Sequence, residues 1–350
     1  MRIEAAWARV AWRPRPNLAA QALRPLSWLY ALLAALHRGW WRTVRKPQRA
    51  PVPVVVVGNL VVGGVGKTPV VIALVQALLA EGRRPGVVSR GYGRREQGLR
   101  AATRDASAQE VGDEPLLIHR RTGVPVWVAA RRIDAARALC AAHPEVDVLV
   151  CDDGLQHHAL ARDVELVVFD ERGAGNGLLL PAGPLRERLP RTPAAAQANR
   201  PNQLVLYTAA APSTALPGFV APRALNLVWR WPDWDRGADA GHAVPLAHLA
   251  GRKLVALAGI GDPERFFGAL ERAGLHIVRL PRPDHADHAT LPWPAGTAEV
   301  ITTEKDAVKL RPEAVGATTV WVAPLDLTLP ADLVARLSRL LQRPRTPPRP

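Results

Sequence analysis

Glycine, lysine and threonine side chains with the spacing of a phosphate-binding turn occupy residues 63–68. The run comprises Gly63, Gly64, Val65, Gly66, Lys67 and Thr68. An apolar β-branched stretch precedes it and an apolar helical pattern follows. Glycines there let backbone N–H groups close around an anion, and the N-terminus of the next helix adds its positive dipole. Lys67 can then reach the β- and γ-phosphates, and the Thr68 hydroxyl can ligate Mg²⁺. The sequence therefore predicts a nucleoside triphosphate site.

The turn departs from the usual phosphate-loop pattern at two positions. Val61 stands where the first glycine is expected. The tighter turn resembles the loops of partitioning ATPases and metal-insertion GTPases, but Val62 stands where many of those carry a lysine. The alternative is a glycine-rich strand-to-helix turn that binds no ligand.

Two adjacent carboxylates, Asp152 and Asp153, end another apolar stretch at residues 146–151. In phosphate-loop enzymes an acid at the end of a neighbouring strand holds Mg²⁺, directly or through water. Adjacent carboxylates repel each other unless a cation lies between them. We predict that both acids serve the metal; the alternative is a helix cap followed by a turn acid.

Asp113 and a histidine-rich loop are the remaining candidates for chemistry. Asp113 opens a predicted helix, so it either caps that helix or takes part in the reaction. The loop carries His285 and His288 interleaved with Asp284 and Asp287. Two histidines three residues apart can bind metal, but no third anchoring ligand is evident. A histidine–aspartate acid–base pair is the more economical interpretation.

The elements that must position these residues alternate between strand and helix. Apolar runs predict buried strands, and helical patterns separate them. The strands are expected at 86–89, 124–129, 146–151, 165–170, 203–207, 253–260, 276–280, 300–303 and 319–322, and the helices at 68–81, 114–121, 131–142, 263–273 and 331–341. This order predicts an α/β fold with a mostly parallel sheet of the phosphate-loop NTPase type and a second, smaller α/β lobe.

The chain is expected to divide into five parts. We predict an N-terminal interfacial helix at 1–48, a phosphate-loop domain at 49–210, a connector at 211–250 with a short antiparallel element, a C-terminal lobe at 251–342 and a disordered tail at 343–350.

The N-terminal segment is apolar but unsuited to crossing a bilayer. Arg24 and Pro25 interrupt it, which leaves residues 26–36 as its uninterrupted part, too short for a span. Trp40 and Trp41 lie among cations, as in helices at the surface of a membrane. A helix packed on the protein's own core and a secretory signal are the alternatives.

Composition limits the possible functions. The chain has 350 residues, of which 48% are hydrophobic and 22% charged, so it is long enough for about two folded domains. Its net charge of +15 favours anionic partners such as nucleic acid, lipid headgroups or phosphorylated sugars. Cys140 and Cys151 have no metal-binding or redox spacing, so buried free thiols in a reducing compartment are expected.

Several motifs together resemble the tetraacyldisaccharide 4′-kinase family. They are GNLVVGGVGKTP at 58–69, SRGYGR at 89–94, VGDEP at 111–115, DDGLQH at 152–157, RGAGNGLLLPAGPLRE at 172–187, AGIGDPERFF at 258–267, PDH at 283–285 and TTEKDAVK at 302–309. The resemblance implies transfer of the ATP γ-phosphate to the 4′-hydroxyl of a tetraacyldisaccharide 1-phosphate, in lipid A biosynthesis. It also implies an anionic glycolipid partner and a location at the cytoplasmic face of the bacterial inner membrane, with no nucleic-acid partner.

The resemblance assigns roles to residues of this chain. Lys67, Thr68, Asp152 and Asp153 would hold ATP and Mg²⁺, while Asp113 and His285 would activate the sugar hydroxyl. Candidates for substrate contact are Asn59, Arg90, Gln156, Arg172, Asn176 and Arg186.

Two points and two rival functions stay open. Arg282 and Ala286 depart from the family pattern around His285, so His288 competes for its role, and residues 302–309 have no assigned part. The rivals are a nucleic-acid-associated or metallochaperone NTPase and a non-catalytic nucleotide-binding protein at the membrane.

Overall fold

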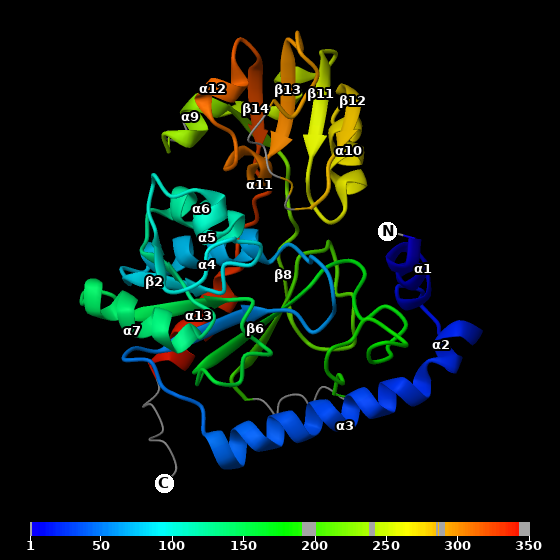
Figure 1. Cartoon of the computed structure of the whole chain (residues 1–350), viewed down its shortest axis with the longest axis vertical. Helices are drawn as coiled ribbons and strands as arrows, with labels where there is room; N and C mark the ends of the chain where they lie inside the picture. Colours follow the sequence, from blue (N-terminus) through cyan, green and yellow to red (C-terminus); the bar gives the residue numbers. More distant parts are fainter. Residues whose placement is uncertain (1, 191–200, 238–241, 285, 287–290, 343–350) are drawn as a thin grey trace. The chain divides into compact units, whose positions relative to one another are not determined.

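The computed structural model describes residues 2–190, 201–237, 242–284, 286 and 291–342 (Figure 1). Its contacts divide the chain into two compact units. Unit 1 comprises Met1–Val88, Arg131–Pro222 and Thr328–Pro350, and unit 2 comprises Ser89–Ala130 and Arg223–Leu327. Both units are discontinuous in sequence, whereas the sequence predicted contiguous parts. The boundaries at 48, 210, 250 and 342 therefore stay a prediction, and the predicted tail at 343–350 lies outside the described residues.

Unit 1 contains a parallel sheet whose central strand is β1. In spatial order its strands are β2 (Pro85–Ser89), β5 (Val148–Asp152), β1 (Val54–Gly58), β6 (Val164–Phe169), β7 (Gln203–Tyr207) and β8 (Phe219–Val220). Each neighbouring pair in this series is parallel. All five residues of β1 are buried, as expected for a strand with both faces covered. The predicted mostly parallel sheet is confirmed.

Three helices of unit 1 match the predicted helical patterns. They are α4 (Lys67–Ala80), α7 (Arg132–Ala142) and α13 (Ala331–Leu341). Helix α4 is apolar nearly all round and buries seven of its residues. Helix α13 is amphipathic and buries Leu333, Leu337, Leu340 and Leu341, which lie on one face at helical spacing.

The N-terminal segment forms several elements rather than one helix. These are α1 (Arg2–Ala11), α2 (Leu18–Ala22), α3 (Arg24–Trp40) and the π-helical turn η1 (Trp41–Arg45). The apolar run was expected to be interrupted at Arg24 and Pro25, and α2 ends just before this point while α3 begins at Arg24. Proline lies in the first turn of α3, where it has no intrahelical hydrogen bond to lose and its restricted φ suits a helix.

Unit 2 contains a six-stranded mixed sheet, seen at the top of Figure 1. Its order is β10 (Val244–Pro245), β9 (Leu227–Arg230), β14 (Thr319–Ala323), β13 (Glu299–Thr303), β11 (Lys253–Ala258) and β12 (His276–Pro281). Strands β14, β13, β11 and β12 are parallel, while β9 pairs antiparallel with both β14 and β10. Strand β9 is the short antiparallel element expected in the connector. A further antiparallel pair joins β3 (Arg100–Ala102) to β4 (Val126–Val128).

The helices of unit 2 are short, and the sequence revealed only the longer ones. They are α5 (Ala108–Val111), α6 (Asp113–Thr122), α9 (Trp231–Asp235), the 3₁₀ turn η3 (Leu246–Leu249), α10 (Pro263–Arg272), α11 (Glu304–Ala307) and α12 (Pro312–Val315). Phe266, Phe267 and Leu270 of α10 pack into a core with the apolar residues of β11. Elements of four or five residues are too short to show a hydrophobic period, which is why α5, α9, α11 and α12 were not predicted.

The two cysteines differ in burial. Both are free thiols. Cys151 in β5 is buried as predicted, and burial raises the pKa of its thiol to about 11. Cys140 in α7 is only partly buried, which corrects the expectation for that residue. It lies near the end of α7, where the helix is no longer covered on all sides.

Candidate active site

The predicted phosphate loop connects the end of β1 to the first turn of α4. Gly66 takes the N-cap position of α4 with φ of 73°, in the left-handed region that glycine adopts without steric cost. No side chain caps the helix. The N-terminal amides of α4 therefore face the loop, as they do in an anion-binding site.

Lys67 lies among polar groups from two strand ends. Its ammonium is 3.4 Å from the amide oxygen of Asn59 and 3.4 Å from Oδ1 of Asp153. Asn59 is fully buried, and its Nδ2 donates to the Gly63 carbonyl at 3.1 Å. Asn59, a predicted substrate contact, therefore positions both the loop and its lysine. Direct contact of Asn59 with substrate stays a prediction.

Asp152 and Asp153 lie beside the loop because β5 pairs with β1. In the parallel register Asp152 is opposite Val57, one residue before the end of β1. Asp152 is almost fully buried. Asp153 adopts φ of 47°, which non-glycine residues seldom do. Such strain is common at functional sites and needs support from the surroundings. Arg132, a buried residue that the sequence analysis missed, donates to the Asp153 carbonyl at 3.2 Å.

The donor set suits Mg²⁺ but supplies few protein ligands. Thr68, Asp152 and Asp153 offer hard oxygen atoms, which Mg²⁺ prefers. Within the described residues, no group of three or more His, Cys, Asp or Glu could hold a metal ion by itself. Mg²⁺ commonly takes one or two carboxylates from a protein and completes its shell with water and phosphate oxygens.

Arg172 connects the phosphate loop to the segment after β6. Its Nη2 donates to the Gly64 carbonyl at 2.5 Å, and its Nε donates to Asp170 Oδ2 at 2.9 Å. Asp170, which directly follows β6, is fully buried, and its carboxylate holds the Arg172 guanidinium in place. The guanidinium also lies over the Trp12 ring, 4.3 Å from its centroid. A cation is thus held at the edge of the loop, and contact of Arg172 with substrate stays a prediction.

Arg186 and Gln156 form a second connection to the loop. Arg186 Nη1 donates to Gln156 Oε1 at 3.0 Å, and Gln156 Nε2 donates to the Asn59 carbonyl at 3.3 Å. The Arg186 amide also donates to the Leu60 carbonyl at 2.7 Å. These two candidates for substrate contact therefore lie beside Asn59, within the same unit.

The side-chain amide of Asn176 forms hydrogen bonds to nearby backbone groups. Its Nδ2 donates to the Ala182 carbonyl at 2.8 Å, and its Oδ1 accepts from the Leu178 amide at 3.0 Å. The side chain is buried. Both ends of the amide are committed to the backbone, which favours a structural role in shaping residues 172–187 over contact with substrate.

The remaining candidates belong to unit 2. Arg90 is exposed just after β2. Asp113 is buried at the first position of α6, and the N-cap is Gly112, whose φ of 94° favours glycine. Asp113 Oδ1 accepts from the Glu114 amide at 3.1 Å. The carboxylate thus contributes to the helix start but does not hold the cap position.

Lys305, in the motif whose role the sequence left open, lies beside Asp113. Its ammonium is 3.8 Å from Asp113 Oδ2, 3.4 Å from Glu114 Oε1 and 3.0 Å from Asp284 Oδ1. His285 and His288 lie outside the described residues, so their competition for the catalytic role stays open. Asp284, immediately before His285, is described. A lysine in the TTEKDAVK motif therefore joins the VGDEP and PDH motifs within unit 2.

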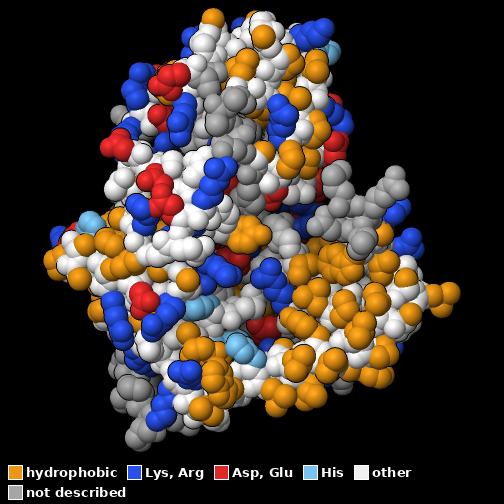
Figure 2. All heavy atoms as spheres, in the orientation of Figure 1, with side chains coloured by type: hydrophobic (Ala, Val, Ile, Leu, Met, Phe, Trp, Pro, Cys, Tyr) orange, Lys and Arg blue, Asp and Glu red, His pale blue; other side chains and the backbone are white. Residues whose placement is uncertain are grey.

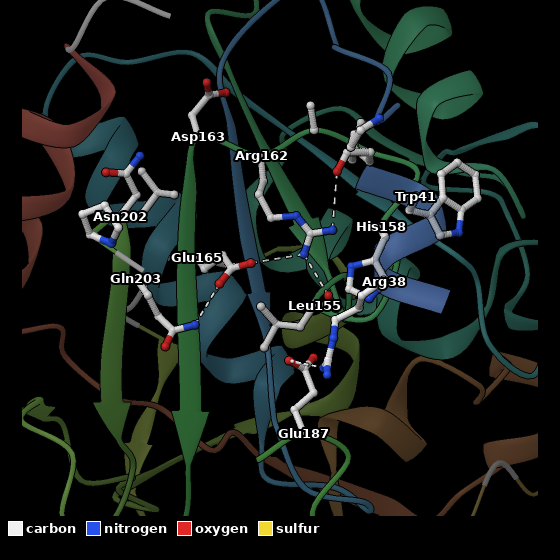
Figure 3. Close-up of a pocket in the computed structure, with 15 residues that line it drawn as sticks. Arg38, Trp41, Leu155, His158, Arg162, Asp163, Glu165, Glu187, Asn202 and Gln203 are labelled. Carbon is white, nitrogen blue, oxygen red and sulfur yellow. Dashed lines mark hydrogen bonds and ion pairs between the residues drawn. The ribbon is translucent and has the colours of Figure 1, made fainter. Parts of the chain in front are cut away.

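A cavity of about 370 Å³ lies in unit 1 between η1, the segment after β5 and the starts of β6 and β7 (Figure 3). Several of its charged side chains pair with one another. Arg162 lies 3.3 Å from Glu165 Oε1, and Glu165 Oε2 accepts from Gln203 at 2.8 Å. Arg38 pairs with Glu187 at 3.2 Å. These pairs fit a structural network.

Comparison with known proteins identifies the family. A family model described as tetraacyldisaccharide-1-P 4′-kinase matches residues 19–342. The chain belongs to the tetraacyldisaccharide 4′-kinase family. A relative of that name from Leptothrix cholodnii is 55% identical over 326 residues, covering 90% of each chain. Another from Methylibium petroleiphilum is 51% identical over 327 residues, covering 92% of this chain and 90% of the relative.

A solved structure supports the same assignment. The LpxK enzyme of Aquifex aeolicus, crystallised in complex with ATP, is similar with a TM-score of 0.73 and 27% identity. The match covers 92% of this chain and 99% of that one. The predicted family, fold and kinase class are therefore confirmed. None of the described helices is both long and apolar enough to span a membrane.

Proposed function

We propose that this chain transfers the γ-phosphate of ATP to the 4′-hydroxyl of a tetraacyldisaccharide 1-phosphate, giving the 4′-phosphorylated lipid and ADP in lipid A biosynthesis. Membership of the tetraacyldisaccharide 4′-kinase family supports the reaction. The observation that carries the proposal is the convergence of Lys67, Asn59 and Asp153 at the phosphate loop. A turn without a ligand would not need a half-buried lysine aimed at two strand ends.

Three groups of residues have separate tasks at the phosphates. The loop amides and Lys67 bind the β- and γ-phosphates and stabilise the charge that develops as the γ-phosphate leaves. Thr68, Asp152 and Asp153 would hold Mg²⁺, which when bound neutralises phosphate charge. Arg172, held by Asp170 beside Gly64, adds a further cation near the loop.

Asp113 is assigned to activate the sugar hydroxyl together with His285. The base accepts the proton of the 4′-hydroxyl. The hydroxyl oxygen forms a bond to the γ-phosphorus, and the bond from that phosphorus to the bridging oxygen of ADP breaks. The burial of Asp113 at 4% exposure favours a role beyond a solvated helix end. Asp113 also shares the Lys305 ammonium with Asp284, the neighbour of His285 in sequence, which supports the pair.

The N-terminal segment is assigned to the membrane surface. Within α3, whose side chains are all described, Ser27 alone is buried. Leu29, Leu32, Leu33 and Leu36 are each more than half exposed, and hydrophobic side chains gather along this edge of the molecule (Figure 2). An exposed apolar stripe with flanking cations is typical of a helix that lies in the headgroup region. It would hold the protein on the cytoplasmic face of the inner membrane, where the anionic glycolipid lies.

One assay tests the proposal. The purified protein is incubated with ATP, Mg²⁺ and a tetraacyldisaccharide 1-phosphate in mixed micelles, and transfer of labelled γ-phosphate to the lipid is measured. We expect transfer that disappears in Lys67→Ala and persists in Lys253→Ala, which removes an exposed lysine of unit 2. ATP hydrolysis that needs nucleic acid, with no lipid product, would instead support the rival NTPase class.

A further inference from the structure

Three carboxylates from two separate segments surround one ammonium in unit 2. Asp113 and Glu114 come from the start of α6, and Asp284 comes from the loop after β12. The Lys305 ammonium lies within 4 Å of an oxygen of each, at 3.8, 3.4 and 3.0 Å respectively. Carboxylates gathered in this way repel each other. A cation between them turns that repulsion into attraction.

Residues before and after Lys305 in the sequence hold its short helix, α11, in place. Thr303 caps α11, and its hydroxyl donates to Asp306 Oδ2 at 2.8 Å. Asp306 is fully buried, and its Oδ2 also accepts from the Gly259 amide at 2.8 Å. The helix is thus fastened to the ends of β13 and β11 directly beside the lysine.

A second contact fastens α11 to α6. The buried Glu304 pairs with Arg121 of α6, and Arg121 Nη2 donates to Asp326 at 2.8 Å. Trp234 Nε1 donates to Glu304 at 2.9 Å. These bonds set the distance between the two helices without Lys305, so Lys305 is not required to hold α11 against α6.

The lysine is charged in this setting. Burial by itself lowers the pKa of an amine, but here the carboxylates of Glu114, Asp113 and Asp284 outweigh it and raise the pKa of Lys305 above its usual value. The three carboxylates offset the cost of keeping this largely buried ammonium charged.

We propose that Lys305 is a positioning residue for phosphate transfer, which holds Asp113 in its ionised form and ties the segment ending in Asp284 to the start of α6. The inference rests on the proposed function and deepens it. Asp284 directly precedes His285, so the ion pair at 3.0 Å brings the histidine's neighbour to the aspartate that receives the proton. Lys305 acts through these acids.

The test compares charge removal with charge retention at Lys305. Lys305→Met keeps the length of the side chain and removes the charge, Lys305→Arg keeps the charge, and Lys253→Met removes an exposed lysine charge elsewhere in unit 2. We expect kcat for lipid phosphorylation to fall about 10- to 100-fold in Lys305→Met, since small misplacements of catalytic groups have effects of this size. KM for ATP should change much less, Lys305→Arg should recover part of the rate, and Lys253→Met should match the wild type.

The pH profile separates positioning from simple stabilisation. Among the described residues, the Lys305 ammonium lies 3.8 Å from Asp113, and the carboxylates of Glu114 and Asp284 approach the same ammonium; Glu110 of the neighbouring α5 is bonded to Ser107. Losing the ammonium leaves the negative neighbours, so the pKa of Asp113 rises. We expect the acidic limb of kcat/KM to move to higher pH in Lys305→Met. A variant that is only less stable would keep the wild-type profile, with activity scaled to its folded fraction in a thermal unfolding assay.

Asp284→Asn provides an independent check. The combined Lys305→Met and Asp284→Asn variant should be little worse than the slower single variant, because residues that act as one unit are not additive. The proposal is overturned by a folded Lys305→Met with wild-type kcat and pH profile, or by additive losses. A rise in KM for ATP at unchanged kcat would also overturn it, since that result places Lys305 on the nucleotide. Absence of lipid phosphorylation in the wild type would instead overturn the proposed function.

Discussion

The Lys67 ammonium lies 3.4 Å from the amide oxygen of Asn59 and 3.4 Å from a carboxylate oxygen of Asp153. We predict that Lys67→Ala lowers kcat by a factor on the order of 10² or more, since the charge matters most as negative charge moves onto the bridging oxygen. Steady-state kinetics measure kcat, and circular dichroism checks that the variant is folded. Activity within about threefold of the wild type would exclude this loop as the catalytic phosphate site.

Asp113 should affect turnover more than stability. We predict that Asp113→Ala lowers kcat strongly with little change in KM for ATP, and that adding His285→Ala makes little further difference. If Asp113 serves only the helix start, its loss should cost about 1 kcal/mol of unfolding free energy and leave turnover near normal. Chemical denaturation beside kinetics decides between these results. Normal turnover in His285→Ala with none in His288→Ala would move the histidine role three residues along.

His158 gives the protein a pH dependence that does not involve the reaction. Burial, then Arg162, lowers its pKa to about 4; Glu187 opposes the shift, while His37 and Arg38 add to it. The unfolded chain, with a pKa near 6.5, binds the proton more readily. Stability should therefore fall as pH falls from about 6.5 towards 4. Thermal unfolding across this range should show a weaker dependence in His158→Gln and an unchanged one in His276→Gln, an exposed histidine. Equal slopes in all three proteins would contradict the assignment.

Residues that act through local spacing were predictable, and those that act through tertiary partners were not. The glycines, Lys67 and Thr68 work within six residues of chain, and Asp152 and Asp153 are recognisable from the strand before them. Arg132 and Lys305 have partners that are distant in sequence: Asp153 is 21 residues from Arg132, and the acids around Lys305 are 21 to 192 residues away. No local pattern therefore signals these contacts, apart from the motif around Lys305 whose role was left open. The left-handed backbone of Asp153 is set by its surroundings in the same way.

One face of helix α3 forms hydrogen bonds to the segment after β6, and the other face is apolar and exposed. Leu29, Leu32, Leu33 and Leu36 are 53%, 56%, 57% and 61% exposed. We predict that changing all four to serine weakens flotation with anionic vesicles and raises the apparent KM for the lipid, while ATP binding is unchanged. The apolar area that would enter the membrane is lost. A matched control changes four exposed leucines elsewhere, namely Leu79, Leu99, Leu227 and Leu291. Equal flotation of both variants would place membrane contact on another element.

Deleting the N-terminal helices is a less selective experiment, because they also support the segment after β6. Trp7 donates to the Pro181 carbonyl at 2.8 Å, Ser27 to Leu179 at 2.8 Å and Tyr30 to Arg186 at 3.1 Å. A deletion would disturb Arg186 as well as the apolar stripe. Substitutions on the exposed face leave these hydrogen bonds intact.

Long elements were predicted well from the sequence. Strand β7 and helix α13 have the expected bounds, and α4, α10 and β11 to β14 differ by one or two residues at an end. The error lies in the N-terminal segment, which was predicted as one interfacial helix and forms α1, α2, α3 and η1. Pro25 lies in the first turn of α3, where a proline is tolerated.

At the scale of the whole molecule, the net charge of +15 should act on membrane binding through long-range attraction. We predict that binding to anionic vesicles weakens as salt rises but does not vanish, because ions screen charge and leave the apolar contribution of α3 intact. Vesicle sedimentation at increasing NaCl, with zwitterionic vesicles as the control, measures both contributions. Binding that is insensitive to salt would show that the charge plays no part.

The order in which the chain visits its two units has a consequence for its synthesis. The chain leaves unit 1 after Val88, returns at Arg131, leaves again after Pro222 and returns at Thr328. Helix α13, with four buried leucines, then completes a core that began with β1. A ribosome adds residues from the N-terminus onward, so β1 and the phosphate loop emerge long before the helix that covers their sheet. Unit 1 cannot finish folding until unit 2 has been made, and incomplete chains expose apolar sheet surface that invites aggregation or chaperone binding.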